Sequence, residues 1–300
     1  MSKFLNKYGL LFAVLVSFNY LFLHMLKGIE SGVVASVRVL LIIISMALLA
    51  TFWKKWKKIP IKELLIIALA GGLNFGLYSY TIATGLQETS ATQGSIIFNT
   101  APIFSMIFAV IFRLEKWSWP AFAGALVAIA GVVISTLGGM HHGSGSLSGD
   151  TLMIISAVLI SFSSVLVSDI SKKYHPAAFT ALLAFFGLVV LIPFSFASIQ
   201  STPWASLGLN NYMMLAFVGV IGGAVVFGSY YKCISEVGAS SAMVYTFFSV
   251  PLTIFYSIVF LGQGVHHLQI IGAVVVLAGA GWSIYQRNKN SAALAHPIHH

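Results

Sequence analysis

Residues 101–135 read APIFSMIFAVIFRLEKWSWPAFAGALVAIAGVVIS, and residues 250–285 repeat their pattern as VPLTIFYSIVFLGQGVHHLQIIGAVVVLAGAGWSIY. In each stretch a proline precedes a run of apolar residues, and a G-x6-G pair follows. Gly124 and Gly131 of the first stretch lie 148 positions before Gly272 and Gly279 of the second. The chain therefore contains an internal repeat.

The same offset relates positions outside these two stretches. The matched pairs are Gly71 with Gly219, Glu88 with Glu236, Ala91 with Ala239 and, after a one-residue slip, Pro102 with Pro251. The repeat is about half the length of the chain, so it predicts two halves of related structure.

The composition assigns the chain to the membrane. Of its 300 residues, 58% are hydrophobic and 8% are charged, and the mean hydropathy is +0.94. Soluble domains carry about 25% charged residues, so lipid must solvate apolar surface that one globular core could not bury. The net charge of +9 sits at the ends of apolar runs and forms no basic stripe, which argues against a nucleic-acid partner. The single cysteine, Cys233, excludes an intramolecular disulfide.

Ten apolar runs are long enough to cross a bilayer, which takes about 20 residues per helix. They cover 8–26, 33–53, 62–86, 91–113, 118–138, 151–171, 176–198, 211–232, 238–262 and 267–285. Because each copy holds five runs, an odd number, the second copy must enter the membrane from the opposite side. We therefore predict an all-α integral membrane protein with ten transmembrane helices in two inverted five-helix repeats. The predicted parts are the first repeat at 1–139, a linker at 140–150, the second repeat at 151–287 and a disordered cytoplasmic tail at 288–300.

The positive charges predict an orientation. If the N-terminus is cytoplasmic, all sixteen Lys and Arg residues except Lys27 and Arg38 fall in cytoplasmic segments. Lys27 falls on the far side, and Arg38 falls within the second run. This positive-inside bias predicts cytoplasmic N- and C-termini and multi-pass insertion in a bacterial inner (plasma) membrane.

The repeated pattern of a proline, an apolar run, an acidic residue and G-x6-G resembles the EamA type of the drug/metabolite transporter superfamily. The runs SYTIATGLQETSATQGS at 79–95 and SYYKCISEVGASSAMV at 229–244 add to the likeness, as does Arg38 in the second span. The resemblance covers nearly the whole chain, although Gln263 stands where the first copy has Glu115. It implies an exporter of amino acids, aromatic ones included, or of other small metabolites, with a central cavity walled by spans 1, 3, 4, 6, 8 and 9.

Polar residues inside the third span share one helix face. Gly71, Asn74, Tyr78, Thr81 and Gly85 follow one another at steps of three or four residues. Such a face can bind substrate, but hydrogen bonding between packed helices explains the pattern equally well. Asn74 is the stronger binding candidate, because an amide can hold both a carboxylate and an ammonium group.

Further candidates for substrate binding are polar or aromatic residues in other spans. Beside Asn74 and Tyr78, they are Asn19, Gln93, Asn99, Ser163, Tyr230, Tyr245 and Phe248. The polar mid-span positions differ between the copies, since Asn74 corresponds to Gly222 and Tyr78 to Val226. We therefore expect the shared glycines and prolines to encode the transport motion and the unshared residues to encode specificity.

Pro102 and Pro251 are candidate gating residues. Each removes a backbone hydrogen bond within a span and so favours a kink, and the pair recurs in the repeat. We interpret them as equivalent hinges, with tolerated packing kinks as the alternative. Arg38 is the one charge expected inside the membrane, where it can pair with a substrate carboxylate, make a structural contact or snorkel toward the outer surface.

Coupling ions, cofactors and metals have little support in the sequence. Ion-coupled carriers commonly place a carboxylate at mid-membrane, but all seven acidic residues lie near the ends of apolar runs. The chain has no phosphate-binding loop for ATP, and neither the His141–His142 nor the His266–His267 pair has the spacing of metal ligands. We predict a carrier without cofactor or metal, driven by the substrate gradient without obligate proton coupling.

The resulting prediction is a non-enzymatic secondary transporter that exports small metabolites, with amino acids as leading substrates. Its partners would be the substrate and the lipid bilayer, and it would act as a monomer or homodimer. One alternative is an importer or exchanger of a nucleoside-like or cofactor metabolite with the same fold. Others are a passive channel and a membrane-embedded enzyme that uses His266, His267 and Asp169.

Overall fold

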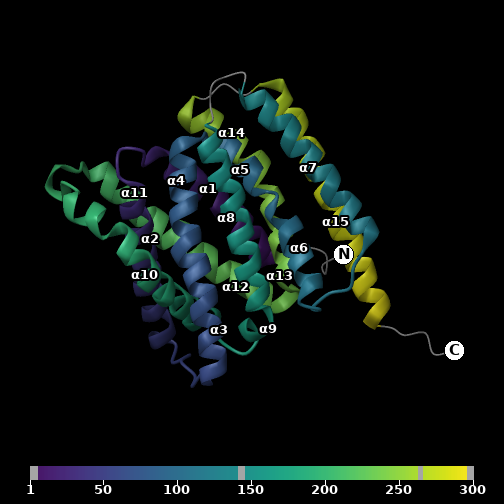
Figure 1. The fold of residues 1–300 in the computed structure, drawn as a ribbon, viewed down its shortest axis with the longest axis horizontal. Helices are drawn as coiled ribbons and strands as arrows, with labels where there is room; N and C mark the ends of the chain where they lie inside the picture. Colours follow the sequence, from purple (N-terminus) through teal and green to yellow (C-terminus); the bar gives the residue numbers. More distant parts are fainter. Residues whose placement is uncertain (1–5, 141–145, 263–265, 296–300) are drawn as a thin grey trace.

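The computed structural model describes residues 6–140, 146–262 and 266–295, and every regular element in these ranges is a helix (Figure 1). The α-helices are α1 (Lys7–Met25), α2 (Ser31–Phe52), α3 (Ile61–Gly71), α4 (Ser79–Glu88), α5 (Ala91–Phe98), α6 (Ala101–Ile111), α7 (Trp119–Met140), α8 (Leu147–Leu166), α9 (Ser168–Ser171), α10 (Pro176–Ser201), α11 (Leu209–Gly219), α12 (Val226–Val237), α13 (Ala239–Val244), α14 (Ser249–Leu261) and α15 (His267–Ala295). Two π-helical segments are η1 (Gly72–Tyr78) and η3 (Val220–Val225), and two 3-10 segments are η2 (Trp204–Ser206) and η4 (Tyr245–Phe248).

Eight stretches of helix are long and apolar enough to cross a membrane. They are Lys7–Met25, Ser31–Phe52, Ile61–Glu88, Ala91–Ile111, Leu147–Leu166, Pro176–Ser201, Leu209–Val237 and Ala239–Leu261. Two shorter apolar stretches, Trp119–Ser135 and His267–Ser283, belong to α7 and α15. All ten predicted spans therefore fall on helices, and eight of them meet the length and composition expected of a membrane span.

The predicted tail and linker differ from the structure at their boundaries. α15 continues to Ala295, so residues 288–295 are helical where we expected disorder. This segment contains alanine, leucine and lysine, which favour helices, so its polarity alone does not end the helix. At the start of the second half, α8 begins at Leu147, inside the predicted linker. Residues 141–145 and 296–300 lie outside the described residues.

The third membrane helix of each half contains a π segment at equivalent positions of the repeat. α3, η1 and α4 follow one another directly, as do α11, η3 and α12. η1 begins at Gly72 and η3 at Val220, 148 positions later. Because π segments are rare and concentrate at functional sites, their recurrence marks a backbone irregularity that both halves share.

Both predicted hinge prolines lie where a span changes its helical type. α5 ends before Asn99 and Thr100, and Pro102 is the second residue of α6. Pro251 is the third residue of α14, directly after the 3-10 segment η4. Each proline therefore stands in the first turn of a helix, where proline is well tolerated, directly after an interruption of the regular α-helix.

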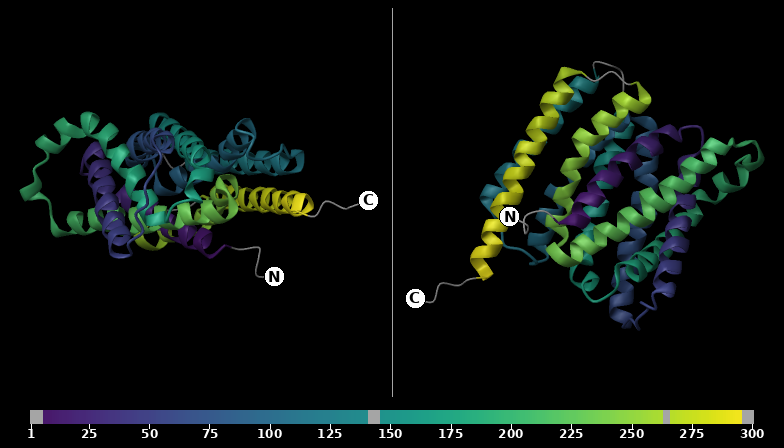
Figure 2. Two further views of the ribbon diagram at one scale, coloured as in Figure 1. Left: turned by 90° about the horizontal axis from the view of Figure 1, so that it is seen from below. Right: turned by 180° about the vertical axis from the view of Figure 1, so that it is seen from behind.

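α7 and α15 pack along each other at one side of the molecule (Figures 1 and 2). Glycines permit this close approach. A Cβ atom added at Gly131 would lie 2.6 Å from the backbone nitrogen of Val276, and one at Gly279 would lie 2.5 Å from that of Ala128. Among the other helices, α1 contacts α4 and α5 of its own half and α12 and α14 of the other half, so it lies where the halves meet.

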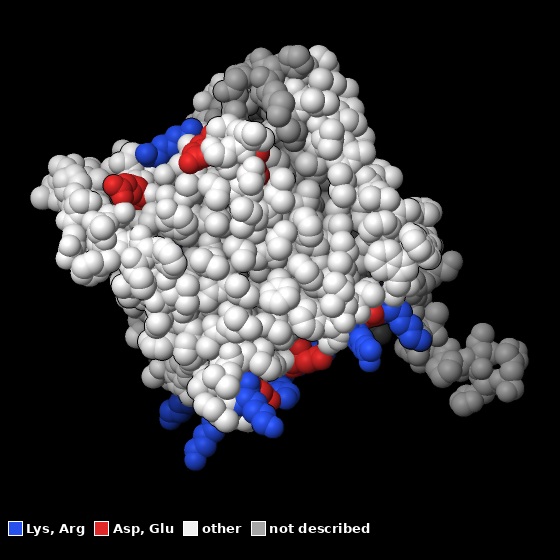
Figure 3. Space-filling view, viewed as in Figure 1, with Lys and Arg blue, Asp and Glu red and all other residues white. Residues whose placement is uncertain are grey.

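Charged side chains gather at the ends of the helices. On the face shown in Figure 3, most Lys and Arg side chains lie along one end. There Lys173 Nζ lies 2.6 Å from Glu63 Oε1. Burial, and then the neighbouring Lys55 and Lys232, lower the pKa of His175 below its ordinary value. This cationic end is the one that the positive-inside rule assigns to the cytoplasm.

Candidate functional site

Arg38, on α2, is buried with 1% of its surface exposed. Its guanidinium carbon lies 5.6 Å from the centre of the Phe227 ring, and the side chains of Tyr78 and Tyr20 lie beside the guanidinium. Its Nε and Nη1 atoms are buried without a hydrogen-bond partner. The ion pairs among the described residues do not include Arg38. A buried cation without an anion is costly, so this arrangement suits an anionic group supplied by a ligand, and it excludes snorkelling to the surface.

Asn74 and Tyr78 come from the π segment η1, and both are buried. Asn74 Nδ2 donates a hydrogen bond of 2.6 Å to the hydroxyl of Tyr231 in the other half, whereas Asn74 Oδ1 has no partner. The centre of the Tyr78 ring lies 6.0 Å from that of Phe98 and 6.2 Å from that of Phe227. Packing thus satisfies the donor of the Asn74 amide and leaves its acceptor available.

Arg38 and five buried residues around it form what we call the central cluster. They are Tyr20 on α1, Arg38 on α2, Asn74 and Tyr78 on η1, Phe98 on α5 and Phe227 on α12. The ring centres of Tyr20 and Phe98 lie 5.8 Å apart. The cluster offers a guanidinium that can donate charge-assisted hydrogen bonds to a carboxylate, and aromatic faces that can pack against an apolar group.

Asn19 precedes Tyr20 on α1 and faces the second half. A Cβ atom added at Gly222 would lie 2.6 Å from Asn19 Oδ1, so the glycine leaves room for the amide. Both polar atoms of the Asn19 amide are buried without a partner. Gly222 is the repeat equivalent of Asn74. Where the first half has the Asn74 amide, the second half therefore has a glycine that leaves room for Asn19.

Three other predicted binding residues are buried and bonded within the protein. Asn99 Nδ2 donates to the carbonyl oxygen four residues earlier at 2.6 Å, and Ser163 Oγ donates to the one three residues earlier at 3.1 Å. The Tyr230 hydroxyl donates to Ser164 Oγ at 2.9 Å, and its ring stacks on Phe12 with centres 4.7 Å apart. These contacts fit packing, although Asn99 Oδ1 has no partner.

The remaining predicted binding residues lie away from the central cluster. Gln93 Nε2 lies 3.4 Å from Asp150 Oδ2, and the Tyr245 hydroxyl accepts a hydrogen bond of 2.6 Å from the backbone nitrogen of Asn6. Both contacts join the two halves near the ends of helices. Phe248 exposes 37% of its surface. The structure does not bring these three side chains together with Arg38.

Two aromatic residues at this site, Phe98 and Tyr231, are not singled out by any sequence motif. Aromatic residues make up 13% of the chain, so one more ring in a span carries little information. A usable signal exists for Tyr231, because it follows Phe227 by four residues and therefore shares its helix face. No comparable signal marks Phe98, which joins the cluster through the fold.

Two observations on the described residues bear on the metal-site and membrane-enzyme alternatives. In the described part of the chain, no three His, Cys, Asp or Glu side chains are grouped to hold a metal ion. The rings of His266 and His267 lie 3.9 Å apart beside the start of α15, whereas Asp169 on α9 pairs with Lys172 at 2.6 Å. These two places lie at opposite ends of the molecule in Figure 1. The three residues required by the membrane-enzyme alternative are therefore not assembled.

Comparisons with known proteins identify the family. The model of the EamA-like transporter family matches the chain twice, over residues 5–137 and 147–285. A second model, of solute carrier family 35, matches residues 78–207. The two EamA-like matches correspond to the two halves of the internal repeat.

Relatives of known sequence and structure are distant but similar over most of their length. The uncharacterized transporter YdfC of Bacillus subtilis is 25% identical over 83% of this chain and 81% of its own. A probable terminal-alkyne amino-acid exporter of Streptantibioticus cattleyicolor is 22% identical over 73% of this chain and 72% of its own. A protein of known crystal structure, 15% identical, superimposes with a TM-score of 0.69 over 94% of this chain and 97% of its own, which supports the fold. The two family matches span most of the sequence, and the chain is therefore a membrane transporter that belongs to the EamA-like transporter family.

Proposed function

We propose that the protein is a secondary transporter that exports a small carboxylate-bearing metabolite, with amino acids as the leading substrates, across a bacterial inner membrane. The observation that carries this proposal is the buried guanidinium of Arg38, whose Nε and Nη1 have no partner. A carboxylate can accept a charge-assisted hydrogen bond from such a donor. The relative named as an amino-acid exporter supports the same substrate class.

The rest of the central cluster complements the other parts of an amino acid. Asn74 Oδ1 is a buried acceptor without a partner and can bind an ammonium group. The rings of Tyr20, Tyr78, Phe98 and Phe227 provide an aromatic surface that favours an aromatic side chain. The same rings could stack on a nucleobase, so import or exchange of a nucleoside-like or cofactor metabolite is the second candidate.

We infer that ten helices cross the membrane as two inverted halves, with both termini in the cytoplasm. The two family matches and the two π segments support the repeat. The gathering of Lys and Arg at one end supports the orientation. With five spans in each half, the second half must have the opposite orientation, as in other carriers built from inverted repeats.

We infer that transport proceeds by alternating access around the central cluster. The cluster residues are buried, which fits a state closed at both ends. All seven acidic residues lie in the described ranges, and each lies near a helix end or in a loop, away from Arg38. A proton relay would need a titratable group near mid-membrane, so the substrate gradient is the driving force that this arrangement favours.

Counterflow in proteoliposomes tests the proposal. Purified protein is reconstituted with a trapped unlabelled amino acid, and accumulation of the same labelled compound is measured for a panel of amino acids and nucleosides. We expect counterflow of at least one amino acid, loss of counterflow for its methyl ester, and no dependence on an imposed pH gradient. Absence of counterflow for every amino acid would refute the substrate class, and nucleoside counterflow would select the second candidate. A steep response to a proton gradient would refute uncoupled transport.

A further inference from the structure

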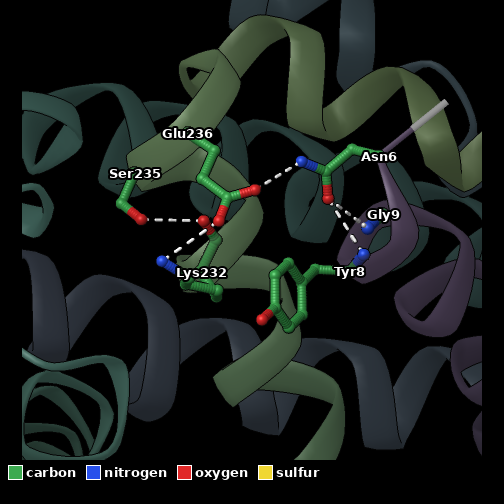
Figure 4. Close-up of polar contacts among 6 residues, drawn as sticks. All are labelled: Asn6, Tyr8, Gly9, Lys232, Ser235 and Glu236. Atoms are coloured by element: carbon green, nitrogen blue, oxygen red, sulfur yellow. Dashed lines mark hydrogen bonds and ion pairs between the residues drawn. The ribbon is translucent and has the colours of Figure 1, made fainter. Parts of the chain in front are cut away.

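Glu236, at the end of α12, contacts the start of α1 in the other half (Figure 4). Asn6 caps α1, because its Oδ1 accepts from the backbone nitrogens of Tyr8 and Gly9 at 2.9 and 3.2 Å. The Nδ2 of the same amide donates to Glu236 Oε2 at 2.7 Å, and Lys232 Nζ lies 3.0 Å from Glu236 Oε1. One side chain thus both caps α1 and attaches it to α12.

Glu88, the repeat equivalent of Glu236, makes the corresponding contact at the end of α4. Ser146 caps α8, because its Oγ accepts from the backbone nitrogen of Gly149 at 3.0 Å. Glu88 Oε2 accepts from the hydroxyls of Ser148 at 2.5 Å and of Ser146 at 3.5 Å. Here too a carboxylate at the end of the third membrane helix of one half binds the capped start of the first helix of the other half.

A glycine three residues after each cap lets the opposite half come close. A Cβ atom added at Gly9 would lie 2.6 Å from the Tyr245 ring, and one added at Gly149 would lie 2.9 Å from Glu88 Cβ. The cap, the glycine and the opposing carboxylate therefore recur together in both halves. Because both contacts contain a cap, a glycine and an opposing carboxylate, we attribute them to the internal repeat and not to chance contacts at the surface.

The two contacts lie at opposite ends of the bundle, and each borders a pocket. Glu88 lines a pocket with Lys27 and Gly28, between the end of α1 and the end of α4. Glu236 lines a pocket with Ser168 and Asp169, between the end of α8 and the end of α12. The pockets share two equivalent elements, the segment after the first membrane helix and the end of the third membrane helix, and they differ in their other lining residues.

We propose that Glu236 with Asn6, and Glu88 with Ser146 and Ser148, are a matched pair of latches that hold the two ends of the transport path closed. The proposal rests on the alternating-access function proposed above, since a carrier must part its halves at one end while they remain joined at the other. A carboxylate beside a helix N-terminus is attracted to the exposed N–H groups there, so each latch is favourable yet reversible. With both latches formed, the substrate is enclosed.

The two latches differ in strength. Glu236 has an additional ion pair with Lys232, and α1 is held further by the hydrogen bond from the Asn6 backbone nitrogen to Tyr245. Glu88 bonds two hydroxyl groups. We therefore expect the Glu236 latch, at the cationic end, to open less readily than the Glu88 latch.

The single cysteine of the chain provides a direct test. Cys233 is buried on α12, three residues before Glu236. The rate at which a bulky maleimide labels Cys233 is measured by mass shift, in purified protein without substrate. We expect Glu236→Gln to raise this rate by about tenfold through local opening, and Glu88→Gln to leave it unchanged. Asn6→Ser should reproduce the rise, because serine retains the helix cap but is too short to reach Glu236.

The opposite end is tested with a matched probe. Ala91, at the start of α5 and three residues after Glu88, is buried, and Ala91→Cys is made in a Cys233→Ser background. Here Glu88→Gln should raise the labelling rate and Glu236→Gln should not. If neither substitution changes labelling, or if each changes both probes alike, the latches are refuted. If amino-acid counterflow is observed but the two probes are not labelled selectively, only the latch proposal is refuted. If labelling is selective but no amino acid shows counterflow, the proposed substrate class is refuted and the latches stand.

Discussion

The third membrane helices of the two halves, Ile61–Glu88 and Leu209–Val237, have the same shape and different chemistry. Both change from α to π at equivalent positions, and both end on a carboxylate that reaches the other half. Within the irregular segment, however, the first helix carries Asn74 and the second carries Gly222. The backbone irregularity belongs to the repeat, whereas the polar groups belong to one copy.

This difference has a structural reason. At the centre of the molecule both helices contribute to the central cluster, the first with Asn74 and Tyr78 and the second with Phe227. Gly222 accommodates Asn19 from α1, and Val226 stands where the first helix has Tyr78. The π segments and the carboxylates that join the halves therefore recur in both copies, whereas the residues around Arg38 differ. Four predictions test this division, from the largest expected effect to the smallest.

Removing the charge at the centre should have the largest effect. Arg38→Gln should lower kcat/KM for export by about 100-fold, near 3 kcal/mol, because a substrate carboxylate would lose its charged donors. Arg38→Lys keeps the charge without the planar pair of donors, so we expect a loss of about tenfold. The measurement is initial-rate counterflow in proteoliposomes. Full activity of Arg38→Gln would show that the guanidinium has a structural role only.

A stability comparison tests whether the packing of the two helices is equally strict. A Cβ atom at Gly71 would lie 2.3 Å from the carbonyl oxygen of Leu183, which is backbone and cannot move aside. At Gly222 the nearest atom is Asn19 Oδ1, on a side chain that can rotate. Gly71→Ala should therefore destabilise the fold by about 2 kcal/mol, and Gly222→Ala by less than about 1 kcal/mol. Thermal unfolding in detergent gives both values, and equal losses would contradict this reasoning.

The unshared amide should affect transport by a smaller factor than Arg38. Asn74→Ala removes an acceptor without a partner and a donor to Tyr231, and should lower kcat/KM by about tenfold, or near 1.4 kcal/mol. Tyr231→Phe is the matched control, because it removes the hydroxyl and retains the Asn74 acceptor. We expect it to lower transport less than Asn74→Ala does. If Tyr231→Phe lowered transport more than Asn74→Ala, the binding group would be the Tyr231 hydroxyl of the second half.

The smallest effect should come from a charge that only the second helix carries. Lys232 pairs with Glu236 on a partly exposed surface, and its repeat equivalent is Thr84. Lys232→Thr should change the free energy of unfolding by no more than about 0.5 kcal/mol, because solvent screens such pairs. Chemical denaturation can measure this. A larger loss would indicate that the ion pair is part of the packing between the halves.

The sequence predicted the helical membrane class and the repeat because both follow from local patterns. The length of an apolar run determines whether a helix can span the membrane. The repeat is visible in the sequence alone because Gly71 and Glu88 each have a counterpart 148 positions later. The position of Arg38 within the second run was likewise visible, since a charge inside an apolar run is rare. The candidate site was predicted less well. Asn74 and Tyr78 join Arg38, but Gln93, Tyr245 and Phe248 do not.

The sequence by itself determined that this chain is an apolar, helical, twofold-repeated protein with its positive charges at one end. Those properties depend on composition and spacing along the chain. Only the tertiary structure decided which side chains contact one another. Phe98 joins Tyr20, Glu236 meets Asn6, and Asn74 meets Tyr231 through distances of many tens of residues along the chain. Such contacts depend on helix rotation and on the π segments, because one extra residue in a turn redirects every side chain that follows it.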